Sequence, residues 1–290
     1  MNFFLDSWLS HYRSLGVKRF IIVDDQSDLP LIDLNLGSDV YIFKPVIGNF
    51  KNFKAFWLQC LMRKYQVPGS LCLCVDSDEY LDIPKSIISV NADLQENPLD
   101  SLLKQSSSLS KYGYIPGLLI DLMPENELIQ VTTQNFIDTM NYHAYVQGKV
   151  DEENEYKGHS SIKWAFGDYW ETAYRYDLRY HVYRTFDCMR KFPVFIYSHD
   201  IELNQGFHSL ARGFGISKLQ NDEYILPIRH YKMIKVLVEG LRLNVDGYFD
   251  RTAENLSRIY NSSVNYTFYK WKNLEKRVYK AAYIKPSLHG

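Results

Sequence analysis

Two short apolar segments in the first third of the chain each end in aspartate, and this repeated pattern limits the possible folds. Residues 17–23 run into Asp24 and Asp25, and residues 71–75 run directly into Asp76. Helix-like stretches separate such segments, an alternation typical of an α/β fold with a mostly parallel sheet. Ligands of these sheets gather beyond the carboxyl ends of the strands. We therefore predict a ligand site at the sheet edge that carries both acidic clusters.

The spacing of apolar residues predicts the elements around these two strands. Helices are expected at 3–15, closed by a left-handed Gly16, and at 51–65, with strands at 40–43 and 112–122. Further helices are expected near 99–103 and, on amphipathic patterns, at 231–249 and 252–260.

Composition narrows the class of protein. With 290 residues, 46% of them apolar, the chain can bury the core of one large domain, or of one domain with a helical appendage. A formal net charge of −1 gives no basic field, so we expect no nucleic-acid partner. No apolar run approaches the roughly 20 residues that cross a bilayer, and no signal region opens the chain, which predicts a cytoplasmic protein.

The cysteines are sparse, and reduced, packed thiols are expected rather than metal ligands or disulfides. They are Cys60, Cys72, Cys74 and Cys188.

Asp76 and Asp78, one residue apart after a strand, can present carboxylate oxygens to a divalent cation and leave coordination sites for phosphate. Such a cation stabilises a diphosphate leaving group without any proton transfer. The same tripeptide also occurs as an ordinary helix cap. The pair therefore indicates a Mn²⁺ or Mg²⁺ site only if the residues around it support that interpretation over a helix cap.

That context resembles the family 2-like glycosyltransferases of the GT-A fold. Residues 8–17 (WLSHYRSLGV) and 20–28 (FIIVDDQSD) look like the family's opening helix, second strand and nucleotide-contacting turn, and 75–81 (VDSDEYL) looks like its metal-binding motif. Looser blocks of a bacterial branch follow at 119–124, 184, 191–193, 206–208 and 228–232. The resemblance covers about residues 2–235 and is specific in the first 85.

The resemblance implies roles for the acidic clusters. Asp24 and Asp25 would face the base and ribose of a nucleotide-sugar donor, although a solvated turn with Asx hydrogen bonds is the alternative. Asp78 would ligate the cation, and Asp76 would contact the ribose or a cation-bound water, so both are candidate metal residues.

Basic and imidazole side chains downstream are candidates for the diphosphate. His208 and His230 could complete a metal site or contact the diphosphate, with His208 preferred. Lys191, Arg184 and Lys232 are possible phosphate contacts because positive groups offset charge on a leaving group.

An inverting transfer needs a carboxylate that deprotonates the acceptor hydroxyl. The candidates are Asp121, Glu125, Asp168 and Glu171, and Asp168 is chosen because it lies in an aromatic region interpreted as the acceptor side. A retaining reaction stays open.

The resemblance also predicts the organisation of the chain. A GT-A-like domain is expected at 1–230, with a nucleotide-binding half at 1–90 and an acceptor half at 112–230, followed by a helical appendage at 231–290. Family members begin with a strand that here is reduced to Met1 and Asn2, so the first strand is expected to be missing.

The expected function is glycosyl transfer to a glycan or lipid-linked acceptor in bacterial surface polysaccharide or lipopolysaccharide synthesis. The basic, aromatic tail at 266–290 suggests peripheral contact with the inner face of the membrane, with a solvated basic helix as the alternative. Two other functions stay open: a degenerate GT-A-fold module that binds sugars or acts as a scaffold, and a metal-dependent phosphoester hydrolase. The hydrolase is disfavoured because His11 is the only histidine before residue 143.

Overall fold

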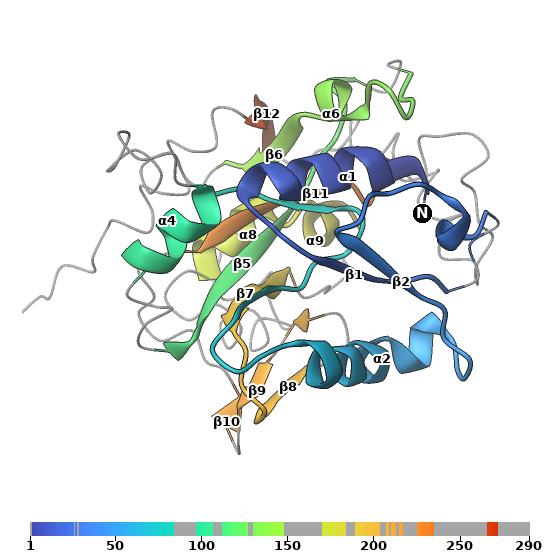
Figure 1. Cartoon of the computed structure of the whole chain (residues 1–290). Coiled ribbons are helices and arrows are strands. Elements are labelled where there is room, and N and C mark those ends of the chain that lie inside the picture. The colour runs from blue at the N-terminus through green and yellow to red at the C-terminus, as the bar shows by residue number, and fades with distance from the viewer. Residues whose placement is uncertain are drawn as a thin grey trace, which may run out of the picture. The chain divides into compact units, whose positions relative to one another are not determined.

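The computed structural model divides the chain into two compact units. Figure 1 labels helices and strands of both. Unit 1 comprises Met1–Gly117 and Lys191–Lys218, and unit 2 comprises Leu118–Arg190 and Leu219–Gly290. Neither unit ends at residue 230, where the sequence predicted a boundary. The structure describes residues 2–25, 27, 29–83, 97–106, 112–126, 130–147, 170–183, 189–203, 207–208, 210–212, 215–216, 225–234 and 266–271.

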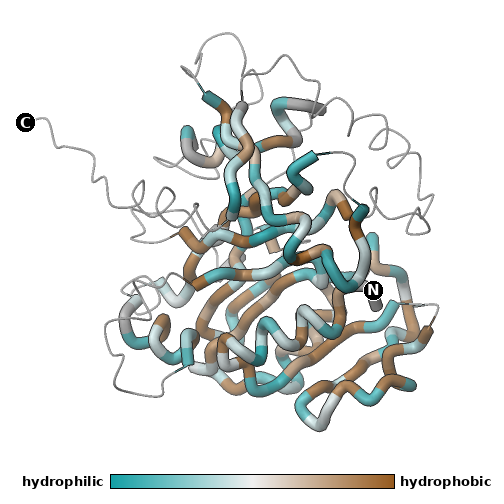
Figure 2. The backbone as a smooth tube through the Cα atoms, turned by 90° about the horizontal axis from the view of Figure 1, so that it is seen from above, coloured by the Kyte–Doolittle hydropathy of each residue, from teal (hydrophilic) through white to brown (hydrophobic). Residues whose placement is uncertain are grey.

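Unit 1 opens with α1 (Asn2–Leu15), an amphipathic helix along which hydrophobic and hydrophilic residues alternate in Figure 2. Its buried face carries Leu5, Leu9 and Tyr12. The helix ends at Gly16, whose φ of 105° is the left-handed conformation that glycine adopts without strain. The predicted helix and its cap are confirmed.

The acidic turns follow short strands, as the sequence predicted. The elements are β1 (Phe20–Val23), the 3₁₀ turn η1 (Leu31–Asp33), β2 (Val40–Phe43), α2 (Phe50–Tyr65), β3 (Leu71–Leu73), β4 (Glu79–Leu81) and α4 (Pro98–Gln105). β1 and β2 pair in parallel as a two-stranded sheet. Asn49 caps α2 by accepting a hydrogen bond from the Asn52 amide at 3.1 Å.

The sheet that contains β3 is mixed, so the expected mostly parallel sheet is not confirmed. β3 is an edge strand and pairs antiparallel with β7 (Arg190–Ile196), which in turn lies beside β5 (Tyr114–Asp121). Apolar runs predict that a strand is buried, but the direction of its neighbour depends on contacts between distant segments. A separate antiparallel sheet contains β8 (Ile201–Leu203), β9 (Leu210–Arg212) and β10 (Gly215–Ile216).

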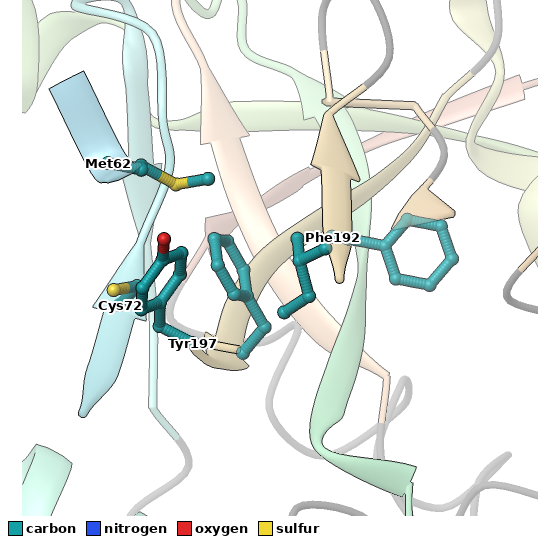
Figure 3. Close-up of a cluster of buried hydrophobic side chains, with 6 residues drawn as sticks. Met62, Cys72, Phe192 and Tyr197 are labelled. Carbon is teal, nitrogen blue, oxygen red and sulfur yellow. The ribbon is translucent and has the colours of Figure 1, made fainter. Parts of the chain in front are cut away.

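A cluster of buried side chains joins α2 to the sheet that contains β3 and β7. Met62 from the end of α2, Cys72 of β3 and Tyr197, just beyond β7, lie together in Figure 3. Gln59 of α2 adds two hydrogen bonds to β8, donating to the Ile201 carbonyl at 2.8 Å and accepting from the Leu203 amide at 2.9 Å. The second half of helix α2 is therefore fixed, which matters because the first two turns of the same helix carry site residues.

The thiols follow the expected pattern with one exception. Cys72 is buried, and burial raises its pKa to about 11, while burial also raises the pKa of Cys74. Both are unreactive thiols at neutral pH. Cys60 is exposed on α2, contrary to the prediction of a packed side chain, and Cys188 lies outside the described residues.

Unit 2 contains the second half of β5, which neighbours β11 (Leu226–His230) in the sheet. Its other elements are α6 (Phe136–Thr139), β6 (Tyr142–Val146), α8 (Trp170–Tyr176), α9 (Leu178–Tyr183) and β12 (Tyr266–Lys270). β12 pairs antiparallel with β6, so the start of the tail is a strand and not part of a helical appendage. Its alternating aromatic residues suit a strand paired with the aromatic β6. Most of the helix predicted at 231–249 and all of that at 252–260 lie outside the described residues.

No helix in the part of the chain that the structure describes is long and apolar enough to span a membrane.

Side chains of α1 hold β4 in place. The buried Tyr12 hydroxyl donates to the Glu79 carbonyl at 3.0 Å and accepts from the Leu81 amide at 2.9 Å. His11 Nε2 lies 2.8 Å from the Leu81 carbonyl. Main-chain groups of a short strand are thereby satisfied by a helix.

We predict that Tyr12→Phe lowers the free energy of unfolding by about 2 kcal/mol, because two buried main-chain groups lose their partner. Urea denaturation measures this change, with Tyr41→Phe as a control at a tyrosine that is 49% exposed. Equal stability of the two variants would show that the Tyr12 hydroxyl does not support β4.

Candidate functional site

Asp76 follows the carboxyl end of β3, and its main chain is held from two sides. Its amide donates to Glu79 Oε2 at 3.1 Å, and its carbonyl accepts from the Glu79 amide at 3.1 Å. Trp8 of α1 donates its indole N–H to the same carbonyl, also at 3.1 Å. The backbone at Asp76 is therefore fixed by a tight turn and by α1.

Two lysines meet the carboxylate of Asp76. Lys54 of α2 pairs with Oδ1, and Lys191 of β7 donates to Oδ2 at 3.2 Å. Lys191 also pairs with Glu79 Oε1 at 2.8 Å, and the side chains of both residues are only 2% exposed. The Asp76 side chain is 27% exposed, so this carboxylate is the part of the cluster that a ligand can reach.

The charges in this cluster shift its pKa values in opposite directions. Burial opposes the charge of Asp76, but the ammonium groups of Lys191 and Lys54 outweigh it and lower the Asp76 pKa below its ordinary value. Burial likewise opposes the charge of Lys191, and Glu79 and Asp76 overcome it and raise the Lys191 pKa. Both side chains are thus charged at neutral pH.

Aromatic rings cover the ammonium groups. The Phe50 ring lies 4.9 Å from Lys54 Nζ, and the Phe207 ring lies 5.2 Å from Lys54 Nζ and 5.8 Å from Lys191 Nζ. Phe207 has a φ of 57°, a left-handed backbone that is rare for a bulky residue and occurs at sites where the surrounding structure imposes it. The half-buried His208 follows Phe207 directly, next to the residue that covers both lysines.

The first two turns of α2 connect the two acidic clusters. Asp25 Oδ2 accepts a hydrogen bond at 2.7 Å from the amide of Phe50, the first residue of α2, and Lys54 one turn later reaches Asp76. Helix α2 thus links the two clusters within unit 1. However, β1 and β3 belong to different sheets, so the expected single sheet edge is not confirmed.

Asp24 supports the turn that follows β1. Its carboxylate is buried and accepts hydrogen bonds from the Leu31 amide at 2.8 Å and the Ser27 amide at 3.3 Å. Burial opposes its charge, but these bonds prevail and lower the Asp24 pKa. These contacts are those of the alternative interpretation, an Asx-bonded turn. A direct contact of Asp24 or Asp25 with a nucleotide stays a prediction.

Asp78 is buried close enough to Asp76 for its charge to raise the Asp76 pKa, although the lysines prevail. Within the described ranges, no three His, Cys, Asp or Glu side chains form a group that could hold a metal ion. Mg²⁺ is commonly bound by one or two carboxylates together with substrate phosphates and water. The donor set of Asp76 and Asp78 fits that mode.

The remaining candidates with described positions belong to unit 2. Asp121, at the end of β5, and His230, at the end of β11, form a buried pair with 2.6 Å between Oδ1 and Nδ1. Glu171 is exposed and pairs with Arg175 at 2.7 Å.

Four more candidates remain, and two of them have described positions in unit 2. Glu125 is exposed, and Lys232 lies in the turn after β11. Asp168 and Arg184 fall outside the described residues.

Sequence reasoning missed several residues of the site, namely Trp8, Phe50, Lys54, Glu79 and Phe207. Lys54 had a detectable signal, because it interrupts an apolar helical stripe that includes Phe50 and Trp57. A lysine within such a stripe is buried only if a carboxylate meets it.

Comparisons with protein-family models, with curated proteins and with solved structures found no match. The functional argument therefore depends on the geometry of the site.

We predict that Asp76→Asn lowers the free energy of unfolding by about 2 kcal/mol at neutral pH, because Lys54 and Lys191 each lose a carboxylate partner. The Asp76 pKa is lowered on folding, so its contribution is complete above the ordinary value of 3.8 and is lost as the pH falls below it. Urea titrations of both proteins from about pH 7 to pH 3 measure the difference.

The matched control is Asp6→Asn, at an exposed position of α1. A difference between wild type and Asp76→Asn that stays constant through the acid range would contradict the role of the ionised Asp76.

Proposed function

We propose that this chain is a glycosyltransferase with a GT-A-like nucleotide-binding region, which moves a sugar from a nucleotide-sugar donor to a glycan or lipid-linked acceptor. The observation that carries the proposal is the partly exposed side chain of Asp76, whose carboxylate is flanked by two ammonium groups at a strand end. Bacterial surface polysaccharide synthesis, in the cytoplasm or at the inner face of the membrane, is the proposed setting, on the resemblance alone. A sugar-binding or scaffolding module is the main alternative.

The charge balance of the site favours a ligand that brings both a cation and an anion. Asp76 and Glu79 meet two lysines, and the charge of Asp78 lies close enough to Asp76 to raise its pKa. These carboxylates would repel a diphosphate alone, whereas a divalent cation would join them to its phosphates. A cation held by Asp76 and Asp78 would offset the charge that develops on the leaving diphosphate.

The lysines provide the second part of the anion site. Lys191 is buried and tied to Glu79, so its ammonium is a fixed positive charge. Lys54 reaches Asp76 from α2 and lies against the rings of Phe50 and Phe207. Rotation of the Lys54 side chain would let its ammonium donate hydrogen bonds to phosphate oxygens, while the buried Lys191 would contribute its fixed charge to the stabilisation of a developing anion.

The identity of the catalytic base stays a prediction. Asp168 remains the proposed base, although its position is not described. Asp121 is committed to His230 in the structure, and a carboxylate that orients an imidazole can also serve general-base catalysis. A phosphoester hydrolase is less favoured, because His11 bonds the main chain of Leu81.

We predict that a nucleoside diphosphate with Mn²⁺ or Mg²⁺ raises the melting temperature by about 5 °C at a ligand concentration about 100-fold above Kd. UDP, GDP, CDP and ADP are tested in turn, each with and without the metal ion. The shift should disappear in Asp78→Asn and persist in the control Asp6→Asn.

The absence of a shift with all four nucleotides would count against the donor site. Binding of free sugars without nucleotide or metal would favour the module. Hydrolysis of a generic phosphodiester that is lost in Asp78→Asn would favour the hydrolase.

We predict that Lys54→Met weakens binding of the same nucleotide–metal pair by about tenfold or more, because hydrogen bonds to charged groups contribute about 1.5–3 kcal/mol. Isothermal titration calorimetry measures the affinity. The control is Lys64→Met, at an exposed lysine in the last turn of the same helix. Equal affinities of the two variants would remove Lys54 from the site.

A further inference from the structure

A loop leads from β2 into α2 (Figure 1), and exposed apolar side chains gather on this loop and on the first turns of the helix. We define the 46–56 patch as Val46, Ile47, Phe50, Phe53 and Phe56. Their exposed fractions are 95% for Val46, 71% for Ile47, 56% for Phe50 and 62% for Phe56, and Phe53 is half-buried. So many large exposed apolar side chains within eleven residues are a feature of interaction surfaces.

Contacts within unit 1 make the patch continuous. The Ile47 carbonyl accepts a hydrogen bond from the Trp57 indole at 3.0 Å, which fixes the loop against α2. Gly48, with a φ of 87°, lies against the Phe53 ring. The rings of Phe53 and Phe56 have centroids 6.4 Å apart. The loop tip and the first turns of the helix thus form one ordered surface.

The chain segment that carries the patch has charge of one sign, although the Asp25 carboxylate, from outside the segment, accepts a hydrogen bond from the Phe50 amide. From Val40 to Val75 the sequence contains no aspartate or glutamate and five cations, of which Lys54 is buried at the candidate site. The exposed cations are Lys44 and Lys51, near the patch, and Arg63 and Lys64, in the last turn of α2. This local excess is hidden in the formal net charge of −1 for the whole chain.

The shape and charge of this surface point to one kind of partner. Val46 is almost fully exposed, so it projects outward and does not line a groove that a rigid protein would fill. Projecting aliphatic and aromatic side chains flanked by lysines match the interface of a bilayer, where apolar groups enter the acyl boundary and cations meet anionic headgroups.

We propose that the 46–56 patch, with its flanking lysines, docks unit 1 onto an anionic lipid bilayer. The surface is separate from the tail at 266–290, whose first residues pair with β6 in unit 2. The proposal does not depend on the proposed glycosyl transfer. The Phe50 ring that contributes to the patch also contacts Lys54, so the docked surface adjoins the candidate site.

Vesicle co-sedimentation of the full chain tests the proposal. Vesicles of phosphatidylcholine with phosphatidylglycerol are compared with vesicles of phosphatidylcholine alone. We expect binding to the anionic vesicles, a decrease of about tenfold in the partition coefficient for Val46→Ser/Ile47→Ser, and a similar decrease for Lys44→Gln/Lys51→Gln. Added salt should weaken binding of the wild type.

The controls match these changes outside the patch. Val67→Ser alters a valine that is 71% exposed at the other end of α2, and Lys18→Gln alters an exposed lysine before β1. Both should bind as the wild type does. Phe56→Ser provides a second test of the patch on the helix itself, and urea midpoints show whether each variant is folded.

Three results would overturn the proposal. The first is a wild-type chain that does not sediment with the anionic vesicles. The second is a Val46→Ser/Ile47→Ser variant that binds them as well as the wild type does. The third is a dimer, seen by analytical ultracentrifugation, that these substitutions dissociate while vesicle binding is unaffected; a second copy would then cover the patch.

Discussion

The ammonium group of Lys191 is almost completely removed from water, and the geometry of unit 1 depends on how its charge is neutralised. An unpaired buried ammonium is too costly to persist, so β7 can occupy its position only if carboxylates meet it there. Glu79 and Asp76 provide them from a single turn after β3. The pairing of β3 with β7 therefore fixes the turn that presents Asp76, and the same interaction links the fold to the candidate site.

Helix α2 contributes to the molecule in two ways. Its buried side supplies Lys54 to the carboxylate of Asp76 and Met62 to the core beneath β3. Its exposed side and the loop before it carry apolar and basic residues with no acids among them. A single amphipathic element thus serves the candidate chemistry on one face and the proposed bilayer contact on the other.

The sequence was most informative where local physics decides the structure. The helix at 3–15 and the strand at 40–43 depend on side-chain periodicity and on capping, and the structure has them at Asn2–Leu15 and Val40–Phe43. The direction of β7 beside β3 depends on contacts between segments distant in sequence, and periodicity does not encode it. The tail was expected to belong to a helical appendage, but its first residues pair with β6.

For the candidate site too, residues in a local sequence pattern were predictable, and residues placed by distant contacts were not. Asp24, Asp25 and Asp76 were found because each follows a strand, a local property. Lys54 was missed because its partner is 22 residues away along the chain. Phe207 was not singled out because a positive φ at a phenylalanine is imposed by the surrounding fold, which composition and spacing do not encode.

The hydrogen bonds that hold the main chain of Asp76 also affect how fast a ligand can bind at this site. Trp8 and Glu79 hold the peptide groups on either side of the residue, so the backbone has little freedom to move when a ligand arrives. A change of partner at the carboxylate then requires only rotations of side chains, chiefly that of Lys54. Such rotations are far faster than the microsecond-to-millisecond closure of a loop or domain. Ligand entry at Asp76 should therefore lack a slow conformational phase.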